Sequence, residues 1–145
     1  MRALVQRVTR ACVRVDGREV AAIERGLLVL LGVQRGDTDA RARALAARLL
    51  AYRMFPDAAG RMNIDVRAAT GGLLVVSQFT LAADTSSGLR PGFSTAAEPA
   101  VANALYERVV AELRAAHAPV ACGVFGADMQ VELVNDGPVT FLLES

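Results

Sequence analysis

Lysine and tryptophan are absent from this chain of 145 residues, and histidine occurs once, as His117. The two cysteines, Cys12 and Cys122, lie in strand-like segments without CxxC spacing, so we interpret them as buried free thiols. The sequence also lacks the HExxH, Walker and GxGxxG motifs of zinc hydrolases, nucleotide triphosphatases and dinucleotide-binding proteins. We therefore expect no metal ion and no cofactor.

Long apolar runs are missing as well. No run reaches the roughly 18 residues that a membrane span needs, and Arg2 and Arg7 interrupt the N-terminus too early for a signal peptide. We expect a cytoplasmic protein that has no membrane partner. Because the net charge is only +1, no broad basic surface is expected, so any RNA contact should be short and DNA is not an expected partner.

The composition is that of a globular protein, with 53% apolar and 21% charged residues. The length predicts one domain that covers residues 1–145. Alternating or continuous apolar patterns predict strands, separated by turn residues, at 3–15, 18–24, 27–33, 62–66, 73–76, 120–125, 130–134 and 139–143. The odd positions of the first strand should form one mostly apolar face.

Two segments have a helical period instead. Residues 38–52 carry apolar side chains on one face, with Asp37 or Thr38 as the N-cap. A capping box of Thr95 and Glu98 predicts the start of a second helix that ends near His117. The pattern as a whole predicts an α+β fold: a β-rich domain with a curved, barrel-like sheet and two amphipathic helices packed on it.

The first polar cluster, Ser77-Gln78-Phe79-Thr80, follows a buried strand directly and precedes a loop at 82–93. Backbone N–H groups at such a strand end can stabilise an oxyanion as charge develops on a carbonyl oxygen. The alternative interpretation is ordinary polarity at the end of a strand.

The second cluster is Asn135-Asp136-Gly137-Pro138-Val139-Thr140. It is either a plain β-turn or a rigid turn with a cis Gly-Pro bond, whose carbonyls can bind an ammonium group. Arg7 falls on the apolar row of the first strand, so we expect its guanidinium to reach a carbonyl or a carboxylate unless a bulge turns it to solvent.

These residues resemble the D-aminoacyl-tRNA deacylase family, whose motifs have the forms SQxTL and NxGPVT. They stand here at 77–81 and 135–140, and the segments 1–8, 28–33, 60–63 and 88–93 resemble family segments in the same order. The resemblance covers the whole chain. The loop at 84–89 departs from the family because it carries little positive charge, which puts a strong phosphate contact there in doubt.

The resemblance implies a homodimeric carboxylic ester hydrolase that frees tRNA of a D-amino acid or glycine at its acceptor end. Ser77, Gln78, Phe79 and Thr80 would form the catalytic pocket. The turn, with Asn135, Gly137, Pro138, Val139 and Thr140, would enter the partner's pocket, bind the α-ammonium and exclude L side chains. Supporting roles would fall to Arg7, which orients the turn, and to Arg90 and Phe93.

Several alternatives stay open from the sequence. Either Thr80 or the ribose 2′-hydroxyl of the tRNA could assist the reaction, and we favour the RNA because no base is evident for Thr80. A trans Gly-Pro bond would admit some L-amino acids. His117 could activate Ser77 or Thr80, although a histidine at a helix end usually binds the last carbonyls. Finally, the chain could be a non-catalytic homodimeric module that binds an RNA end or a small ligand.

Overall fold

A computed structural model describes residues 1–86 and 88–145. Ser87, part of the predicted loop at 82–93, lies outside the described residues. The strands are β1 (Arg2–Val15), β2 (Arg18–Ile23), β3 (Gly26–Gly32), β4 (Phe55–Pro56), β5 (Met62–Ile64), β6 (Gly72–Ser77), β7 (Val120–Cys122) and β8 (Gln130–Glu144). The helices are α1 (Asp39–Ala51), the short 3-10 helix η1 (Phe79–Ala82) and α2 (Pro99–Ala116).

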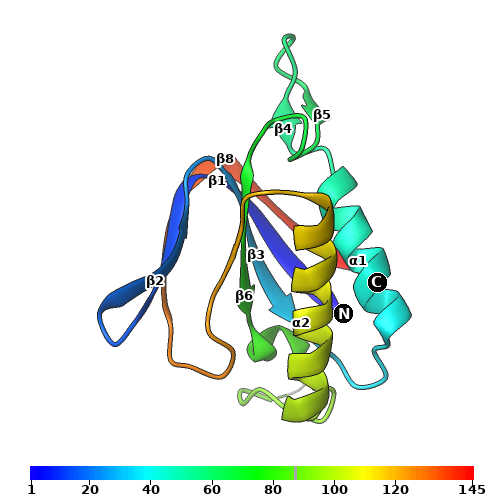
Figure 1. Ribbon diagram of the computed structural model, residues 1–145. Helices are drawn as coiled ribbons and strands as arrows, with labels where there is room; N and C mark the ends of the chain where they lie inside the picture. The colour runs from blue at the N-terminus through cyan, green and yellow to red at the C-terminus, as the bar shows by residue number, and fades with distance from the viewer. Residues whose placement is uncertain (87) are drawn as a thin grey trace.

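The main sheet is curved and has six strands in the order β2-β1-β3-β6-β7, while β8 pairs with β1. The adjacent apolar strands β3 and β6 run parallel, with Leu31 opposite Ser77. Figure 1 shows α1 and α2 side by side against one face of this sheet. The predicted α+β class, with a barrel-like sheet and two helices, is confirmed.

The long strand β1 contributes to two hydrophobic cores. Ala3 and Val5 belong to the core between the sheet and the helices, whereas Val8, Ala11 and Val13 belong to the core on the opposite face. The pairing of β1 with β8 changes register between Gln6 and Val8 and again between Val8 and Arg10. A bulge rotates the following side chains to the other face of a sheet. The prediction of one apolar face along the odd positions was therefore wrong.

The two helices begin differently from each other. Thr38 is the N-cap of α1, and its hydroxyl accepts a hydrogen bond from the backbone N–H of Arg41. The predicted capping box of α2 was wrong, because Glu98 is the N-cap without a side-chain cap bond and Pro99 is the first helical residue. Proline suits that position because its missing N–H would have had no helical acceptor. Thr95 instead donates its hydroxyl hydrogen to the carbonyl of Ala82.

The second polar cluster is not a turn between two strands. It lies inside the continuous strand β8, at the irregularity opposite Gln6 and Val8, so the plain β-turn interpretation was wrong. Both cysteines are free, as predicted, but Cys12 and Cys122 are partly exposed rather than buried.

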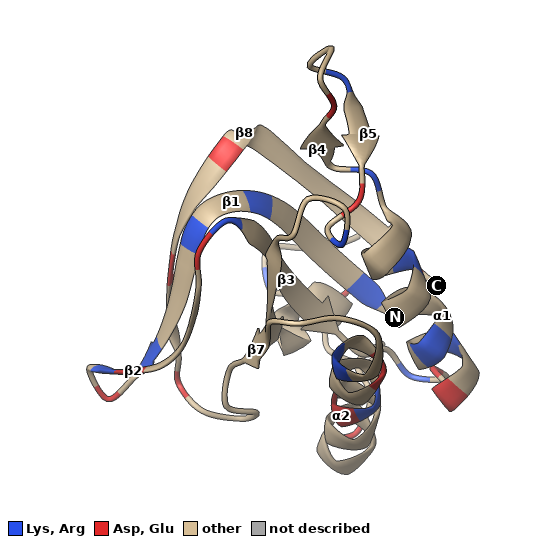
Figure 2. Cartoon of the chain, turned by 45° about the horizontal axis from the view of Figure 1, so that its top comes forward, with Lys and Arg blue, Asp and Glu red and all other residues tan. Residues whose placement is uncertain are grey.

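Acidic and basic residues are interspersed along the elements in the view of Figure 2. Asp39 of α1 contacts Arg108 of α2 at 2.6 Å, and these charges tie the outer faces of the two helices together. Within the described ranges, neither helix has a stretch long and apolar enough to cross a bilayer.

Candidate active site

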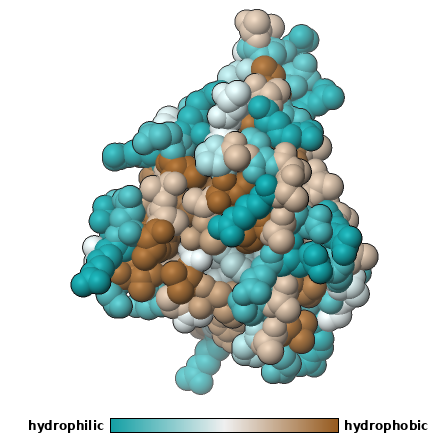
Figure 3. Space-filling model, viewed as in Figure 1, coloured by the Kyte–Doolittle hydropathy of each residue, from teal (hydrophilic) through white to brown (hydrophobic). Residues whose placement is uncertain are grey.

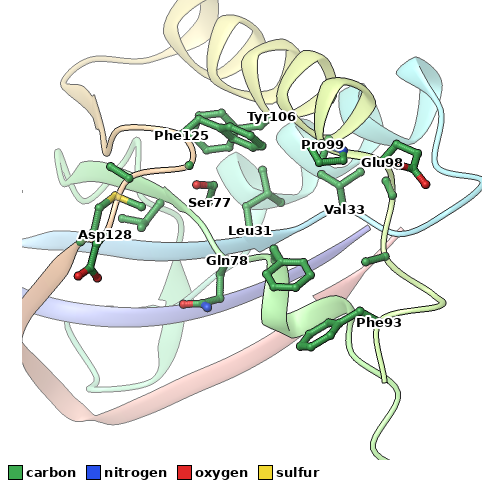
Figure 4. Close-up of a pocket in the computed structure, with 18 of the residues that line it drawn as sticks. Leu31, Val33, Ser77, Gln78, Phe93, Glu98, Pro99, Tyr106, Phe125 and Asp128 are labelled. Carbon is green, nitrogen blue, oxygen red and sulfur yellow. The ribbon is translucent and has the colours of Figure 1, made fainter. Parts of the chain in front are cut away.

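A pocket of about 630 Å³ lies where β3 and β6 end, next to the N-terminal turn of α2. Ser77, Gln78 and Phe79 of the first polar cluster line it. Figure 4 shows the rings of Tyr106 and Phe125 together at one end of the pocket, and their centroids are 5.8 Å apart. The volume and the aromatic wall are suited to a small organic ligand of nucleoside size.

The backbone at the first cluster leaves the sheet at this pocket. Gln78 donates its N–H to the carbonyl of Leu31 at 2.8 Å, and the chain then turns into η1. Gly32 permits the turn, since a Cβ atom there would lie 2.8 Å from Cβ of Leu81. The first N–H groups of a helix have no acceptor within it. Those of Phe79 and Thr80 are therefore free to bind an oxyanion.

The side chains of this cluster differ in their positions. The amide of Gln78 donates to the hydroxyl oxygen of Thr80 at 2.5 Å. Thr80 is exposed and does not belong to the pocket wall. The ring of Phe79 stacks on that of Phe93 with a centroid distance of 4.4 Å, and both rings lie at the pocket. Phe93, to which the resemblance gave a supporting role, thus lies beside the first cluster, whereas Arg90 is exposed and is not among the pocket residues.

The second cluster is held in shape by Asn135. Its amide donates to the carbonyl of Val139 and to the hydroxyl of Thr140, both at 3.2 Å, and its oxygen accepts the N–H of Val139 at 2.8 Å. These bonds enclose Gly137 and Pro138, which are exposed and joined by a cis peptide bond. The carbonyl-bearing tip of this bulge therefore faces outward from the chain.

Arg7 connects the second cluster to the body of the protein. Its Nε donates to the carbonyl of Asp136 at 2.9 Å and lies 3.0 Å from the carboxylate of the same residue. Its Nη1 donates to the carbonyl of Met54 at 2.7 Å. The side chain is only 11% exposed, so the predicted carbonyl and carboxylate contacts are both present and the solvent-facing alternative is wrong.

The two polar clusters do not meet within one chain. Arg7, beside the second cluster, is opposite Leu27, which is opposite Leu73, and Ser77 lies four residues further along β6. That offset is about 13 Å along the strands, and β8 and β6 are separated by three strand spacings of about 4.8 Å each. A site that uses both clusters therefore needs a second copy of the chain.

His117 lies far from both candidate nucleophiles. Its Nε2 is 2.7 Å from the carbonyl of Gly71, which directly precedes β6, whereas Ser77 ends the strand. Six residues of strand span about 20 Å, so His117 cannot activate Ser77 or Thr80. His117 is the C-cap residue of α2, as expected from its place at the helix end. Its side chain, however, contacts the carbonyl of Gly71 rather than the last carbonyls of the helix.

Replacing His117 by alanine should therefore leave hydrolysis unchanged within about twofold. The free energy of unfolding should fall by about 1 kcal/mol through the lost hydrogen bond to Gly71. Steady-state kinetics and urea unfolding of the same preparation test both parts. A loss of activity that exceeds the loss of folded protein would contradict this assignment.

The charged or titratable side chains in the pocket wall are those of Arg35, Glu98, Tyr106 and Asp128. Burial raises the pKa of Tyr106, and its hydroxyl donates to the carbonyl of Val75 at 2.9 Å, so it stays protonated near neutral pH. Within residues 1–86 and 88–145, no three histidine, cysteine or carboxylate side chains gather closely enough to hold a metal ion.

Sequence reasoning did not find the far wall of the pocket. Tyr106 fits the pattern of an ordinary apolar helix face, and Phe125, Asp128 and Met129 follow a short strand without any motif. The segment that carries the last three reaches the pocket because it connects β7 with β8. Only its aromatic residue gave a signal, and that signal is common in cores.

Comparisons with known proteins identify the family of this chain. Residues 4–144 match the family described as D-Tyr-tRNA(Tyr) deacylase. A protein of Cellvibrio japonicus (strain Ueda107) is 60% identical over 99% of both chains, and one of Stutzerimonas stutzeri (strain A1501) is 61% identical over 100% of both. Each is named D-aminoacyl-tRNA deacylase.

Two solved structures are also similar. One, named "c-Myc DNA Unwinding Element Binding Protein", has a TM-score of 0.95 and 40% identity and covers 100% of this chain and 99% of its own. The other, described as a probable eukaryotic D-amino acid tRNA deacylase, has a TM-score of 0.84 over 99% of this chain and 98% of its own. At 19% identity it shows that the fold is the same. With a family match over nearly its full length and relatives at about 60% identity, this chain belongs to the D-Tyr-tRNA(Tyr) deacylase family.

Proposed function

We propose that this protein, acting as one domain over residues 1–145 in the cytoplasm, hydrolyses the ester bond of D-aminoacyl-tRNA and of glycyl-tRNA. The products are the free amino acid and tRNA. The observation that carries the proposal is the pocket lined by Ser77, Gln78 and Phe79 at the start of η1, where Phe79 and Thr80 carry the first backbone N–H groups of the helix. The relatives of this chain are named D-aminoacyl-tRNA deacylase.

The ester carbonyl binds these N–H groups, so that its oxygen is stabilised as it becomes an oxyanion. The terminal adenosine occupies the pocket beside Ser77 and Gln78, against the aromatic wall of Tyr106 and Phe125. An aminoacyl ester is already reactive, so positioning and the ribose 2′-hydroxyl supply what remains. Water adds to the carbonyl carbon, and the bond to the ribose oxygen breaks.

Chirality is selected across the subunit interface of a homodimer. The outward-facing carbonyls of Gly137 and Pro138 enter the partner's pocket, bind the α-ammonium and leave no space for an L side chain. D side chains point away from this turn, and glycine has none to exclude. The distance between the two clusters within one chain supports this arrangement.

The strand β8 supports a homodimer independently. Among the described residues it pairs only with β1, so a strand of 15 residues forms one edge of the sheet. Exposed edges invite pairing with another chain, and β8 exposes Leu133, Val134 and Leu142. Exposed apolar residues also form the brown patches on the face of the molecule drawn in Figure 3.

The direct test is hydrolysis of D-Tyr-tRNA, L-Tyr-tRNA and Gly-tRNA by the purified protein in the presence of a chelator. We expect the D and glycyl esters to disappear while the L ester persists. Cleavage of L-Tyr-tRNA at a similar rate would contradict the chiral mechanism. Persistence of all three esters would show that the protein is not a deacylase.

The hydroxyl of Thr80 is not the nucleophile in this mechanism, because its oxygen accepts from Gln78 and, within residues 1–86 and 88–145, it has no hydrogen bond to a carboxylate or imidazole. Thr80→Val should keep activity within about threefold, whereas a tRNA ending in 2′-deoxyadenosine should react about 100-fold more slowly. Single-turnover rates on both substrates decide the point. The reverse pattern would assign the chemistry to Thr80.

The second candidate function is non-catalytic binding, as a homodimeric module for a nucleic-acid end or a small ligand. It is favoured by the relative at 40% identity, whose name includes a DNA element. The net charge of +1 argues against a long DNA footprint. A gel-shift titration with single- and double-stranded DNA, run beside the hydrolysis assay, separates the two functions.

A further inference from the structure

The rim of the pocket carries a cation and two exposed rings on one flank. Arg35 lines the pocket and is exposed. Its backbone N–H donates to the carbonyl of Thr95 at 2.8 Å, which places it two residues from Phe93 along the facing segment. Phe93 in turn stacks on Phe79. Arg35 and the two stacked rings are therefore carried by neighbouring segments of the pocket wall.

All three residues are exposed. The rings of Phe79 and Phe93 are 56% and 38% exposed, although such rings are usually covered. Within the part of the chain that the structure describes, the guanidinium of Arg35 forms no ion pair, while many of the other arginines do. Exposed aromatic rings beside an arginine are a common means of binding single-stranded nucleic acid.

The opposite end of the pocket has a different character. Figure 4 shows Asp128 on the other side of Gln78 from Phe93. A carboxylate there disfavours the approach of a phosphate, so a nucleic-acid strand leaves the pocket on the flank of Arg35. Glu98 also lies on this flank and partly offsets its positive charge.

We propose that Arg35, Phe79 and Phe93 form a second nucleotide subsite, which binds the nucleotide that precedes the terminal aminoacyl-adenosine. Arg35 binds the phosphodiester between the two nucleotides, and the exposed rings stack on the preceding base. This inference rests on the proposed function and extends it, because it explains how a short RNA end is recognised without a broad basic surface.

The test compares two substrates that differ by this nucleotide: the D-tyrosyl ester of adenosine and that of the dinucleotide CpA. For the wild type, kcat/KM should be higher on the dinucleotide. Arg35→Gln should lower kcat/KM on the dinucleotide about tenfold and leave the adenosine ester unchanged, and Phe93→Ala should lower kcat/KM about tenfold more on the dinucleotide than on the adenosine ester. Phe93→Tyr should restore the wild-type value, and Glu98→Gln should raise kcat/KM on the dinucleotide.

Salt provides a second measurement. Loss of one phosphate contact should reduce the slope of log kcat/KM against log salt by about 0.7 for Arg35→Gln on the dinucleotide. The matched control is Arg18→Gln, at the start of β2 and outside the pocket wall, which should change neither quantity. Equal losses on both substrates would overturn the subsite. If the wild type cleaves neither of the two esters nor D-Tyr-tRNA, the proposed function itself fails. That outcome is separate from failure of the subsite, because it is measured on the wild type and not on the variants.

Discussion

Replacing Gly137 by alanine should lower the hydrolysis of D-Tyr-tRNA by about 100-fold or more, the scale on which a displacement of about 1 Å acts. A Cβ atom at this position would lie 2.3 Å from the backbone nitrogen of Val139 and 2.6 Å from its Cγ2. Asn135 holds that same nitrogen, so the bulge must shift as a whole. The carbonyls proposed to bind the α-ammonium then move out of place.

The control for this variant is Gly60→Ala, at the tip of the β4–β5 hairpin. Gly60 has a φ of +78°, and a Cβ atom there would meet nothing within 4 Å. Its replacement should cost about 1 kcal/mol of stability and leave the rate unchanged. If Gly137→Ala retained full activity, the bulge would not be part of the site.

Complementation shows whether the bulge acts across subunits. Phe79→Pro removes the proposed oxyanion N–H at the first position of η1, where proline fits the backbone. Two inactive preparations, Gly137→Ala and Phe79→Pro, should regain up to about a quarter of the wild-type activity after mixed refolding, because half of the dimers then carry one intact site. Failure to regain activity in verified mixed dimers would place both clusters in the same subunit's site.

Replacing Arg7 by alanine is the second large effect that we expect. The guanidinium of Arg7 binds the backbone carbonyl and the side-chain carboxylate of Asp136, and it also binds the backbone carbonyl of Met54. Its loss leaves those acceptors without their donor, which should cost about 2 kcal/mol of stability. Because the bulge loses its anchor to the body, kcat should fall about 100-fold even in the folded protein. Urea unfolding and kcat measured below the unfolding transition separate the two effects.

Arg7→Lys and Arg14→Ala are the comparisons for this variant. A lysine ammonium cannot present the two-sided donor geometry of a guanidinium, so Arg7→Lys should be intermediate in kcat. Arg14 lies on the same strand and forms exposed ion pairs with Glu19 and Glu132, which usually contribute little. Arg14→Ala should therefore retain full activity, and an equal loss in both alanine variants would show that Arg7 acts on the strand rather than on the bulge.

The sequence predicted those parts of the candidate site that depend on a short stretch of residues. Ser77-Gln78-Phe79-Thr80 stands at the end of an apolar run, and a polar tetrapeptide there must lie where the strand leaves the core. Arg7 on an apolar row required an acceptor, because an unpaired buried guanidinium is too costly. Both inferences depend only on residues close together along the chain, and their order can be read from the sequence.

Other features depend on which segments meet, and local patterns misled there. Thr95 and Glu98 have the spacing of a capping box, but Thr95 bonds to Ala82 instead. The residues 135–138 have turn composition, yet pairing with β1 continues on both sides of them and makes them a bulge within β8. In both cases a contact distant in sequence was more favourable than the local one.

By itself the sequence determined the α+β class, the periods of α1 and β3, and the two clusters that resemble the family, because periodicity and motifs are written along the chain. Only the tertiary structure decided that Phe125 and Asp128 face Ser77 and that Arg7 binds the carbonyl of Met54. It also decided that the two clusters lie too far apart to share a site within one chain. Those facts follow from strand order and register, which are set by packing over the whole sheet rather than by any one segment.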